Sequence, residues 1–490
     1  MKFYEVPEAI KQGMSDKNTR PYVVVLLGEK RIPAADIVSC EITNYQSSEG
    51  GIKTAGTIIL DNSENEYSPD SDETYRPNLE VKVLYGFRSE TFHRFTLYVD
   101  SKGFQNEQTG HNEKICTLKL VDFSEILDDA KRQAEWNTAN TFVNCKVSDS
   151  QNPEHSIVHI LAKTAGINPD EIETCGLPFS IPYISLTKTV WKELCELATA
   201  YDARLECGIS KPLSFLESRY ENSEKDETSC WTLTRNDITH YRRYDSYENY
   251  ANDIRLKFTR YVKGERQELW RYSDSPYWYD SSEKLCYPFT DDNREILTNK
   301  SYEAEYTAVN SDGNPRTVVY AEDIDDEETF LENMKVGGTE KLKVLKYDTK
   351  TNKKKAYIRL DRAGKNINVY EMKIMGVPIL SEPNFCVYTK DAAQIQKYGI
   401  QSVNLTNRYL SDDEYDGKPI YKHFAEEKLK ELTQMKNSYF VKTNYALISA
   451  RVGSFIDLNL TEPKKMKIEE INFRYKKNDA FETCLWLKEA

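Results

Sequence analysis

Alternation of apolar and polar residues dominates the first part of the chain. A period of two is typical of strands that bury one face. Several short runs of this kind, separated by turn-forming residues, indicate a small barrel or a sandwich. A continuous apolar strand is expected at residues 21–27, and the further runs cover residues 39–45, 54–60, 79–85, 91–99 and 114–121. The segment at residues 122–132 follows them and predicts a short helix with Asp122 as its N-cap.

Two later stretches repeat apolar residues with the period of a helix. They cover residues 156–165 and 186–200, and we expect Thr187 or Thr189 to cap the second one. A hairpin pattern at residues 203–217 follows, so this part of the chain predicts a small α+β unit. The apolar face of the second helix consists of Val190, Trp191, Leu194, Leu197 and Ala198.

The second half of the chain returns mostly to strand patterns. Residues 321–335 are acidic and predict a surface segment with a short helix, and residues 424–432 predict another helix. Two runs in the middle of the chain, at residues 339–347 and 355–361, are expected to pair. Closing strands are predicted at residues 447–450, 455–460, 466–475 and 481–487.

The length of 490 residues is too great for one small core and indicates several domains. The predicted fold class is mainly β with an α+β insert. We expect an N-terminal β-barrel at residues 1–135, an α+β domain at 136–226 and a second β-rich domain at 227–400. Residues 401–490 complete the chain with a helix and closing β-barrel strands.

Composition narrows the classes of function. The net charge of -13 and a pI near 5.3 disfavour a protein that grips nucleic acid through its phosphates. The 33 tyrosines favour half-buried sheets and contact surfaces. The ten cysteines include no C-x-x-C pair, which indicates reduced thiols made in a cytoplasm. The first residues lack the apolar core of a secretory signal, and no stretch of 18 apolar residues predicts a membrane span.

Two patterns resemble metal sites but lack a required residue. His155 and His159 are four residues apart on a predicted helix, yet Ser156 stands where a metalloprotease needs glutamate. We expect one solvated and one packed histidine. The loop from Asp61 alternates oxygen-bearing side chains, but Glu66 occupies the position of the essential glycine of a calcium loop. A polar connection between strands is expected there, with Ser63, Asn65 and Asp72 as its other polar residues.

Two further features offer acid–base or stacking chemistry. The acidic pairs Asp128-Asp129 and Asp325-Asp326 could supply an acid and a base, but we expect them to be solvated. The aromatic run at residues 270–279 could stack on a ligand, but we expect it to pack a β domain against a neighbour. The sequence contains no P-loop, no G-x-G-x-x-G and no G-x-S-x-G motif. We therefore expect no catalytic, cofactor-binding or metal-binding residues and no cofactor.

Several stretches follow the order of one family, although each is weak alone. The chain resembles the hub or tip proteins of phage tails, which are related to hub proteins of contractile injection systems. The match extends over roughly the first 210 residues and the last 95, and residues 230–395 match poorly. The stretches are residues 39–69, 81–104, 117–129, 156–167 (SIVHILAKTAGI), 181–207, 397–410 (KYGIQSVNLTNRYL), 425–432 and 451–460 (RVGSFIDLNL).

The resemblance implies a non-enzymatic structural subunit of a virion tail. It implies tube-lining β-barrels and a homotrimer that closes the tail tube at the tip or baseplate, with a channel for genome ejection. The implied partners are the tail tube or distal tail protein, the tape-measure protein, and distal tip or receptor-binding proteins. Genome DNA would pass transiently through the channel without stable nucleic-acid binding. Assembly would take place in the host cytoplasm, and the chain ends without the extra C-terminal domain of many relatives.

Two other functions remain open from the sequence. One is a tail-associated cell-wall hydrolase or peptidase, whose site would have to lie in residues 230–395. The other is a module that binds host carbohydrate through the Tyr- and Trp-rich stretch. For the hub function, we also expect an acidic channel wall built from residues 20–135 and from the strands after Leu447, because basic side chains would retain DNA.

Overall fold

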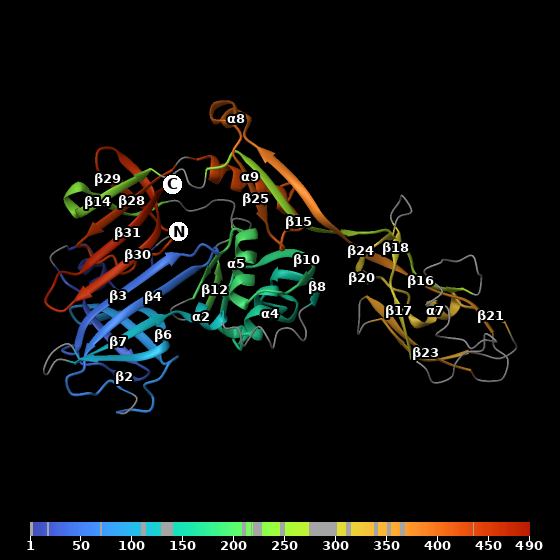
Figure 1. The fold of residues 1–490 in the computed structure, drawn as a ribbon, viewed down its shortest axis with the longest axis horizontal. Helices are drawn as coiled ribbons and strands as arrows, with labels where there is room; N and C mark the ends of the chain where they lie inside the picture. The colour runs from blue at the N-terminus through green and yellow to red at the C-terminus, as the bar shows by residue number, and fades with distance from the viewer. Residues whose placement is uncertain are drawn as a thin grey trace.

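The computed structural model confirms a mainly β protein with several sheets and a few helices. A body of strands and helices carries a slender arm at one end (Figure 1). None of the helices in the described ranges has the length and hydrophobicity needed to cross a membrane. The structure describes residues 3–16, 19–68, 71–108, 114–128, 141–207, 212–216, 218, 228–245, 250–273, 301–309, 315–337, 342–349, 354–362, 368–434 and 436–490.

One sheet organises the body, with 16 strands in the described part of the chain. Its path runs β14-β28-β31-β30-β3-β4-β7-β6-β5-β1-β2, and β9, β11, β12, β13 and β29 pair beside it. The strands are β1 (Tyr22–Leu27), β2 (Lys30–Arg31), β3 (Ile37–Gln46), β4 (Ile52–Asp61), β5 (Glu80–Phe87), β6 (Glu90–Gln108), β7 (Lys114–Val121), β9 (Ile172–Thr174), β11 (Arg204–Glu206), β12 (Leu213–Leu216), β13 (Ser229–Thr234), β14 (Ile238–Asp245), β28 (Asn437–Thr443), β29 (Phe455–Asn459), β30 (Pro463–Lys476) and β31 (Glu482–Glu489).

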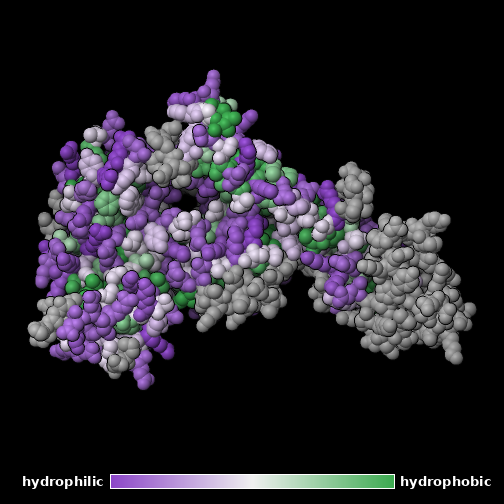
Figure 2. Space-filling model, viewed as in Figure 1, coloured by the Kyte–Doolittle hydropathy of each residue, from purple (hydrophilic) through white to green (hydrophobic). Residues whose placement is uncertain are grey.

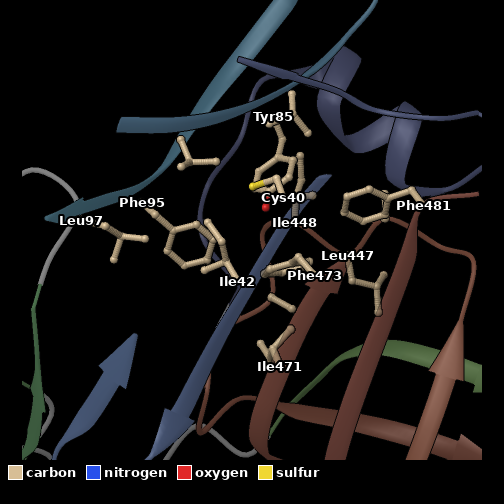
Figure 3. Close-up of a cluster of buried hydrophobic side chains, with 14 of the residues drawn as sticks. Cys40, Ile42, Tyr85, Phe95, Leu97, Leu447, Ile448, Ile471, Phe473 and Phe481 are labelled. Carbon is tan, nitrogen blue, oxygen red and sulfur yellow. The ribbon is translucent and has the colours of Figure 1, made fainter. Parts of the chain in front are cut away.

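The two ends of the chain meet in this sheet. Strand β3 pairs antiparallel with β30 over seven residue pairs, from Ser39↔Lys476 to Tyr45↔Glu470. Figure 3 shows side chains from both ends pointing into one core, among them Ile42 and Tyr85 from the first part and Phe473 from the last. The Tyr85 and Phe473 rings are 5.8 Å apart. The first and last of the expected regions therefore share one sheet and one hydrophobic core, while the boundaries of the four domains stay a prediction.

A second core belongs to the α+β part of the body. It packs α4 (Ile157–Thr164) and α5 (Val190–Ala200) with β8 (Thr141–Ser148) and β10 (Leu177–Ser185). Helix α5 confirms the prediction for residues 186–200, and its predicted apolar face is buried. Thr189 is the N-cap residue by position, but its hydroxyl bonds to Asp128 instead of capping the helix.

A long ribbon rises from this core and continues into the arm (Figure 1). Strand β15 (Asp253–Lys263) lies between the 23-residue β24 (Asn368–Lys390) and the parallel β25 (Ser402–Thr406). Helix α9 (Ile420–Thr433) packs against the ribbon and confirms the helix predicted at residues 424–432. Helix α8 (Ala392–Tyr398) follows the end of β24.

The arm is an insertion between β15 and β24 with a hydrophobic core of its own. The predicted pairing of residues 339–347 with 355–361 is confirmed, and the acidic segment at 321–335 contains the predicted short helix. The elements of the arm are β16 (Gln267–Ser273), β17 (Ser301–Glu305), β18 (Ala308–Val309), β19 (Pro315–Arg316), β20 (Val318–Glu322), α7 (Glu327–Glu332), β21 (Lys335–Gly337), β22 (Leu342–Asp348) and β23 (Lys355–Arg362).

One predicted strand is wrong. Residues 447–450 form a turn, although Leu447 and Ile448 are fully buried. Short-range backbone bonds such as Ile448 N to Ala446 O close this turn, so an apolar run that suggested a strand is a buried loop. Helix α2 (Phe123–Leu127) begins at its predicted cap, Asp122, but the predicted remainder from residue 129 to 132 lies outside the described residues.

Candidate functional site

The two histidines do not combine into an exposed pair. His155 is exposed at the end of a short 3-10 helix, whereas His159 is buried in α4. The His159 Nδ1 atom lies 2.6 Å from the Ser156 hydroxyl oxygen. Burial lowers the pKa of His159, which favours a neutral ring that can accept the hydroxyl proton. Ser156 has no exposed surface, so a substrate could not reach this Ser–His contact.

The loop from Asp61 folds on itself. The Asp61 carboxylate accepts hydrogen bonds from the Ser63 backbone N–H at 3.0 Å and the Ser63 hydroxyl at 2.6 Å. These bonds lower the pKa of Asp61. Asp72 accepts the corresponding pair of bonds from Thr74. Across the ranges that the structure describes, no cluster of three or more His, Cys, Asp or Glu residues could hold a metal ion.

The acidic pairs do not converge on a common site. Asp325 is buried and accepts bonds from the Arg266 guanidinium, the Asn333 amide and the Met375 N–H, whereas Asp326 caps α7 through the Thr329 N–H. The prediction that Asp325 is solvated is therefore wrong. Asp129 lies outside the described residues.

The described end of the aromatic run is part of the arm. Trp270 and Tyr272 are buried in the arm core and not at a contact between domains. Residues 274–279 of the run lie outside the described residues. The described rings therefore offer no exposed stacking platform.

A small polar cavity lies where β6, β11 and the chain start meet. Its volume of about 10 Å³ suits one water molecule at most. Arg94 is buried beside it, sandwiched by the Tyr4 and Phe95 rings, and donates to the Ala450 carbonyl at 3.0 Å. The cavity lining consists of Tyr4, Asn44, Thr54, Arg94, Phe95, Thr96, Leu97, Asp122, Glu206 and Cys207.

Charged groups from separate parts of the chain surround this cavity. Glu206 of β11 accepts bonds from Arg204 and, at 2.8 Å, from Arg451 near the C-terminal strands. Asp122 accepts from the Thr54 N–H, and burial raises the pKa of Asp122 to about 6. The cluster therefore ties three segments together, and the cavity has no room for a substrate.

One face of the long sheet points away from the hydrophobic core. The strand registers align Thr43, Asn472 and Cys484 across β3, β30 and β31 on this face. Strands β14, β28, β4 and β7 extend it on both sides, and we call it the open face. It runs across strands from both ends of the chain. Its charged residues in the described strands are Lys53, Lys119, Arg242, Lys442, Lys467, Arg474, Lys476, Lys488, Glu41, Asp61, Glu470 and Glu482.

Aromatic side chains gather at one end of the open face. The Trp486 ring lies 5.1 Å from Tyr244 and 5.3 Å from Phe440. The Arg242 guanidinium lies 4.9 Å from the Tyr244 ring. Such a mixture of half-buried aromatic and arginine side chains is typical of protein–protein contacts.

Strand β14 forms the edge of the sheet beside these rings. In the described part of the chain it pairs only with β28, and residues 239–243 are exposed on both faces of the strand. A fully exposed edge strand readily pairs with another chain, and native proteins usually cover or charge such edges. The open face therefore ends in an unprotected strand edge beside a group of half-buried aromatic rings.

No family model and no curated protein matches this chain. Solved structures do match along nearly its whole length. The tail protein from Neisseria meningitidis MC58 has a TM-score of 0.50 at 9% identity, covering 96% of this chain and 97% of that one. The chain has a tail-protein fold.

Two further structures are similar over most of their length. The 43 kDa tail protein of prophage MuSo2 from Shewanella oneidensis has a TM-score of 0.47 at 11% identity, covering 95% of this chain and 98% of that one. Prophage tail protein gp18 from Listeria monocytogenes EGD-e has a TM-score of 0.41 at 10% identity, with 95% and 94% covered. The likeness to the Neisseria meningitidis tail protein confirms the sequence resemblance to phage tail proteins at the level of the fold.

Sequence reasoning missed the open face and its β14 edge. The signal was present in residues 238–245, where His240, Arg242 and Tyr244 alternate on one side of a strand. Residues 437–443 show the same alternation around Phe440. Tyr244 and Phe440 contact the Trp486 ring only because strands far apart in the sequence pair with one another. No local sequence pattern predicts these contacts.

Proposed function

We propose that the chain is a structural, non-enzymatic subunit of a phage-type tail. In this proposal three copies form the hub or tip that closes the tail tube, and they connect the tube to the distal tip or baseplate. The tail tube or distal tail protein, the tape-measure protein and the receptor-binding proteins are the proposed neighbours. The proposed location is the virion tail, after assembly in the host cytoplasm.

The observation that carries the proposal is the open face on a tail-protein fold. A single sheet that includes strands from both ends of the chain gives each subunit a broad, rigid wall. The wall ends in an exposed β14 edge flanked by aromatic rings. Repetition of such a wall around an axis would enclose a channel and cover the edges.

The charges of the open face bear on the expected acidic channel wall. Among the described residues, lysine and arginine outnumber aspartate and glutamate on this face. Part of this charge is neutralised within the face, as in Lys442–Glu482 at 2.6 Å and Arg474–Glu41 at 3.0 Å. An acidic channel therefore requires another face to line it, and the open face would then contact neighbouring subunits.

Electron microscopy of the purified chain tests the proposal. We expect three-fold particles with a central hole, and mass photometry should give the mass of three 56.9 kDa chains. A monomer at all accessible concentrations, or a ring of six copies in reconstructed tails, would reject the trimeric hub. The same reconstruction would show which face lines the channel.

The non-enzymatic part of the proposal has a separate test. The small cavity and the locally satisfied carboxylates support the absence of hydrolysis. Zymography on peptidoglycan and on casein should show no cleared band. A band that persists through repurification would favour the cell-wall hydrolase instead.

A further inference from the structure

Helix α8 projects from the body without a buried residue of its own. Figure 2 shows hydrophobic surface on this projection. Tyr388 at the end of β24 is 69% exposed, Tyr398 at the end of α8 is 41% exposed and Ile400 is 66% exposed. Large apolar side chains gathered on a protruding element indicate an interaction site.

Polar contacts hold this projection in a fixed shape. The buried Asn252 side chain donates to the Gly399 carbonyl at 2.7 Å and accepts from the Gln401 N–H at 2.8 Å. Asp391 caps α8 by accepting from two backbone N–H groups, and the Tyr250 ring packs edge-on against Tyr398 at 5.8 Å. The exposed side chains are therefore preorganised, which lowers the entropy lost when a partner binds.

Cations surround these apolar side chains. The solvent side of the ribbon carries Arg255 and Lys257 on β15 and Lys390 on β24, while the other side packs on α9. Lys397 lies 4.8 Å from the Tyr398 ring. Within the described ranges, no ion pair involves Lys257 or Lys390. We call these residues, with Tyr388, Tyr398 and Ile400, the α8 surface, and its basic character contrasts with a net charge of -13 for the whole chain.

The arm offers a surface with complementary chemistry. Glu327, Glu328 and Glu332 of α7 are exposed and form no ion pair with the described residues, and Leu331 between them is 36% exposed. The helix is fixed from behind, because its Phe330 stacks on Tyr347 with ring centroids 4.7 Å apart. Acidic side chains around an exposed leucine match cations around exposed tyrosine and isoleucine.

These two surfaces cannot meet within one chain, since α7 lies on the arm and α8 lies on top of the body (Figure 1). We propose that the arm of one copy docks through α7 on the α8 surface of a second copy. The contact joins two different patches, so it is heterologous and closes into a ring if the rotation between copies permits. This inference rests on the proposed trimer and assigns the arm to holding neighbouring copies together.

Charge exchange tests the docking. We expect Lys390→Glu with Lys397→Glu to raise the concentration at half-assembly about tenfold or more, because like charges then face each other. Glu327→Lys with Glu328→Lys should do the same. Combining all four substitutions should restore assembly, which a merely misfolded surface would not do. Mass photometry across a dilution series measures each variant.

A matched control reverses the charge of two lysines outside both surfaces. Lys102→Glu with Lys163→Glu changes the net charge equally at exposed positions far from both surfaces in the sequence, and assembly should stay within about twofold of wild type. If this control weakens assembly as much as the α8 variant does, net charge and not docking explains the effect. The proposal is then wrong.

A photoreactive residue at position 398 of the full chain locates the contact. We expect an intermolecular cross-link to residues 322–337 of a second copy, identified by mass spectrometry. A wild-type trimer that gives no such cross-link and tolerates the charge reversals would overturn the docking while leaving the hub function intact. A wild-type protein that is monomeric, without any cross-link at high concentration, would overturn both. A cross-link to another segment would also reject the docking.

Discussion

Replacing Arg408 by methionine should destabilise the body strongly, because Arg408 neutralises a buried carboxylate. Glu193 of α5 has no exposed side-chain surface and accepts bonds from the Arg408 guanidinium and the Tyr409 hydroxyl. The backbone N–H groups of Thr187 and Lys188 donate to its other oxygen, each at 2.8 Å. The substitution removes the only formal positive charge among these four donors and leaves the carboxylate buried.

The expected cost follows from this geometry. Removing one partner of a buried ion pair usually costs about 3–5 kcal/mol. The Arg408 side chain is 30% exposed, so water can enter its place, and we expect about 3 kcal/mol. For a body of roughly 380 residues that unfolds in one transition, an unfolding entropy of about 2.1 cal/mol/K per residue converts this cost into a fall in Tm of roughly 4 °C.

The measurement is thermal unfolding at pH 7, followed by intrinsic fluorescence. Burial alone would raise the pKa of Glu193. The bonds from Arg408 and Tyr409 lower this pKa by more than burial raises it, so the pKa of Glu193 lies below its ordinary value. The stabilisation is therefore present above the unfolded pKa of about 4.3 and is lost as the pH falls through the folded pKa. At pH 7 the full effect should be observed.

Two variants decide whether the reasoning is correct. Arg243→Met removes an exposed pair with Asp245, whose side chains are 52% and 51% exposed, and should leave the Tm nearly unchanged. Glu193→Gln combined with Arg408→Met should cost less than the two single changes added together. An Arg408→Met protein that melts with the Arg243→Met control would refute the argument.

Three further outcomes are expected. Trp191→Ala, at a fully buried position, should cost about 3–5 kcal/mol in thermal unfolding, whereas Lys192→Ala on the exposed side of α5 should be nearly silent. Burial raises the pKa of Asp122 to about 6, so its contribution to stability is present below the unfolded pKa of about 3.9 and is lost as the pH rises through about 6; the Tm of wild type minus that of Asp122→Asn should therefore fall across this window. Replacing residues 265–377 by an Asn-Gly turn should leave the body folded with one main transition, because β15 and β24 pair up to that point; loss of the transition would show that the arm is part of the body's folding unit.

Local patterns predicted elements well where short-range forces decide them. The cap at Asp122 and the buried face of α5 follow from residue type and spacing alone. The apolar run at residues 447–450 correctly predicted burial, but the strand was wrong. Buried residues occur in turns as well as in strands, so burial alone does not identify a strand.

The candidate site was harder to predict because it depends on pairs of distant residues. Asn472 donates to Glu41 at 2.9 Å and to Thr43 at 2.8 Å across more than 400 positions of sequence. Asn252 likewise braces Gly399 across 147 positions. A single sequence contains no local trace of such contacts, so neither the open face nor the α8 surface could be located from it.

The pairing of β3 with β30 also has a consequence during synthesis. The ribosome makes residues 37–46 early, and their partner strand at residues 463–476 more than 400 residues later. Until then the N-terminal strands expose one unpaired edge and the half of the core that the C-terminal strands later cover. A prematurely terminated chain therefore cannot complete its wall. Until residues 463–476 have been made, the nascent chain remains accessible to chaperones and proteases.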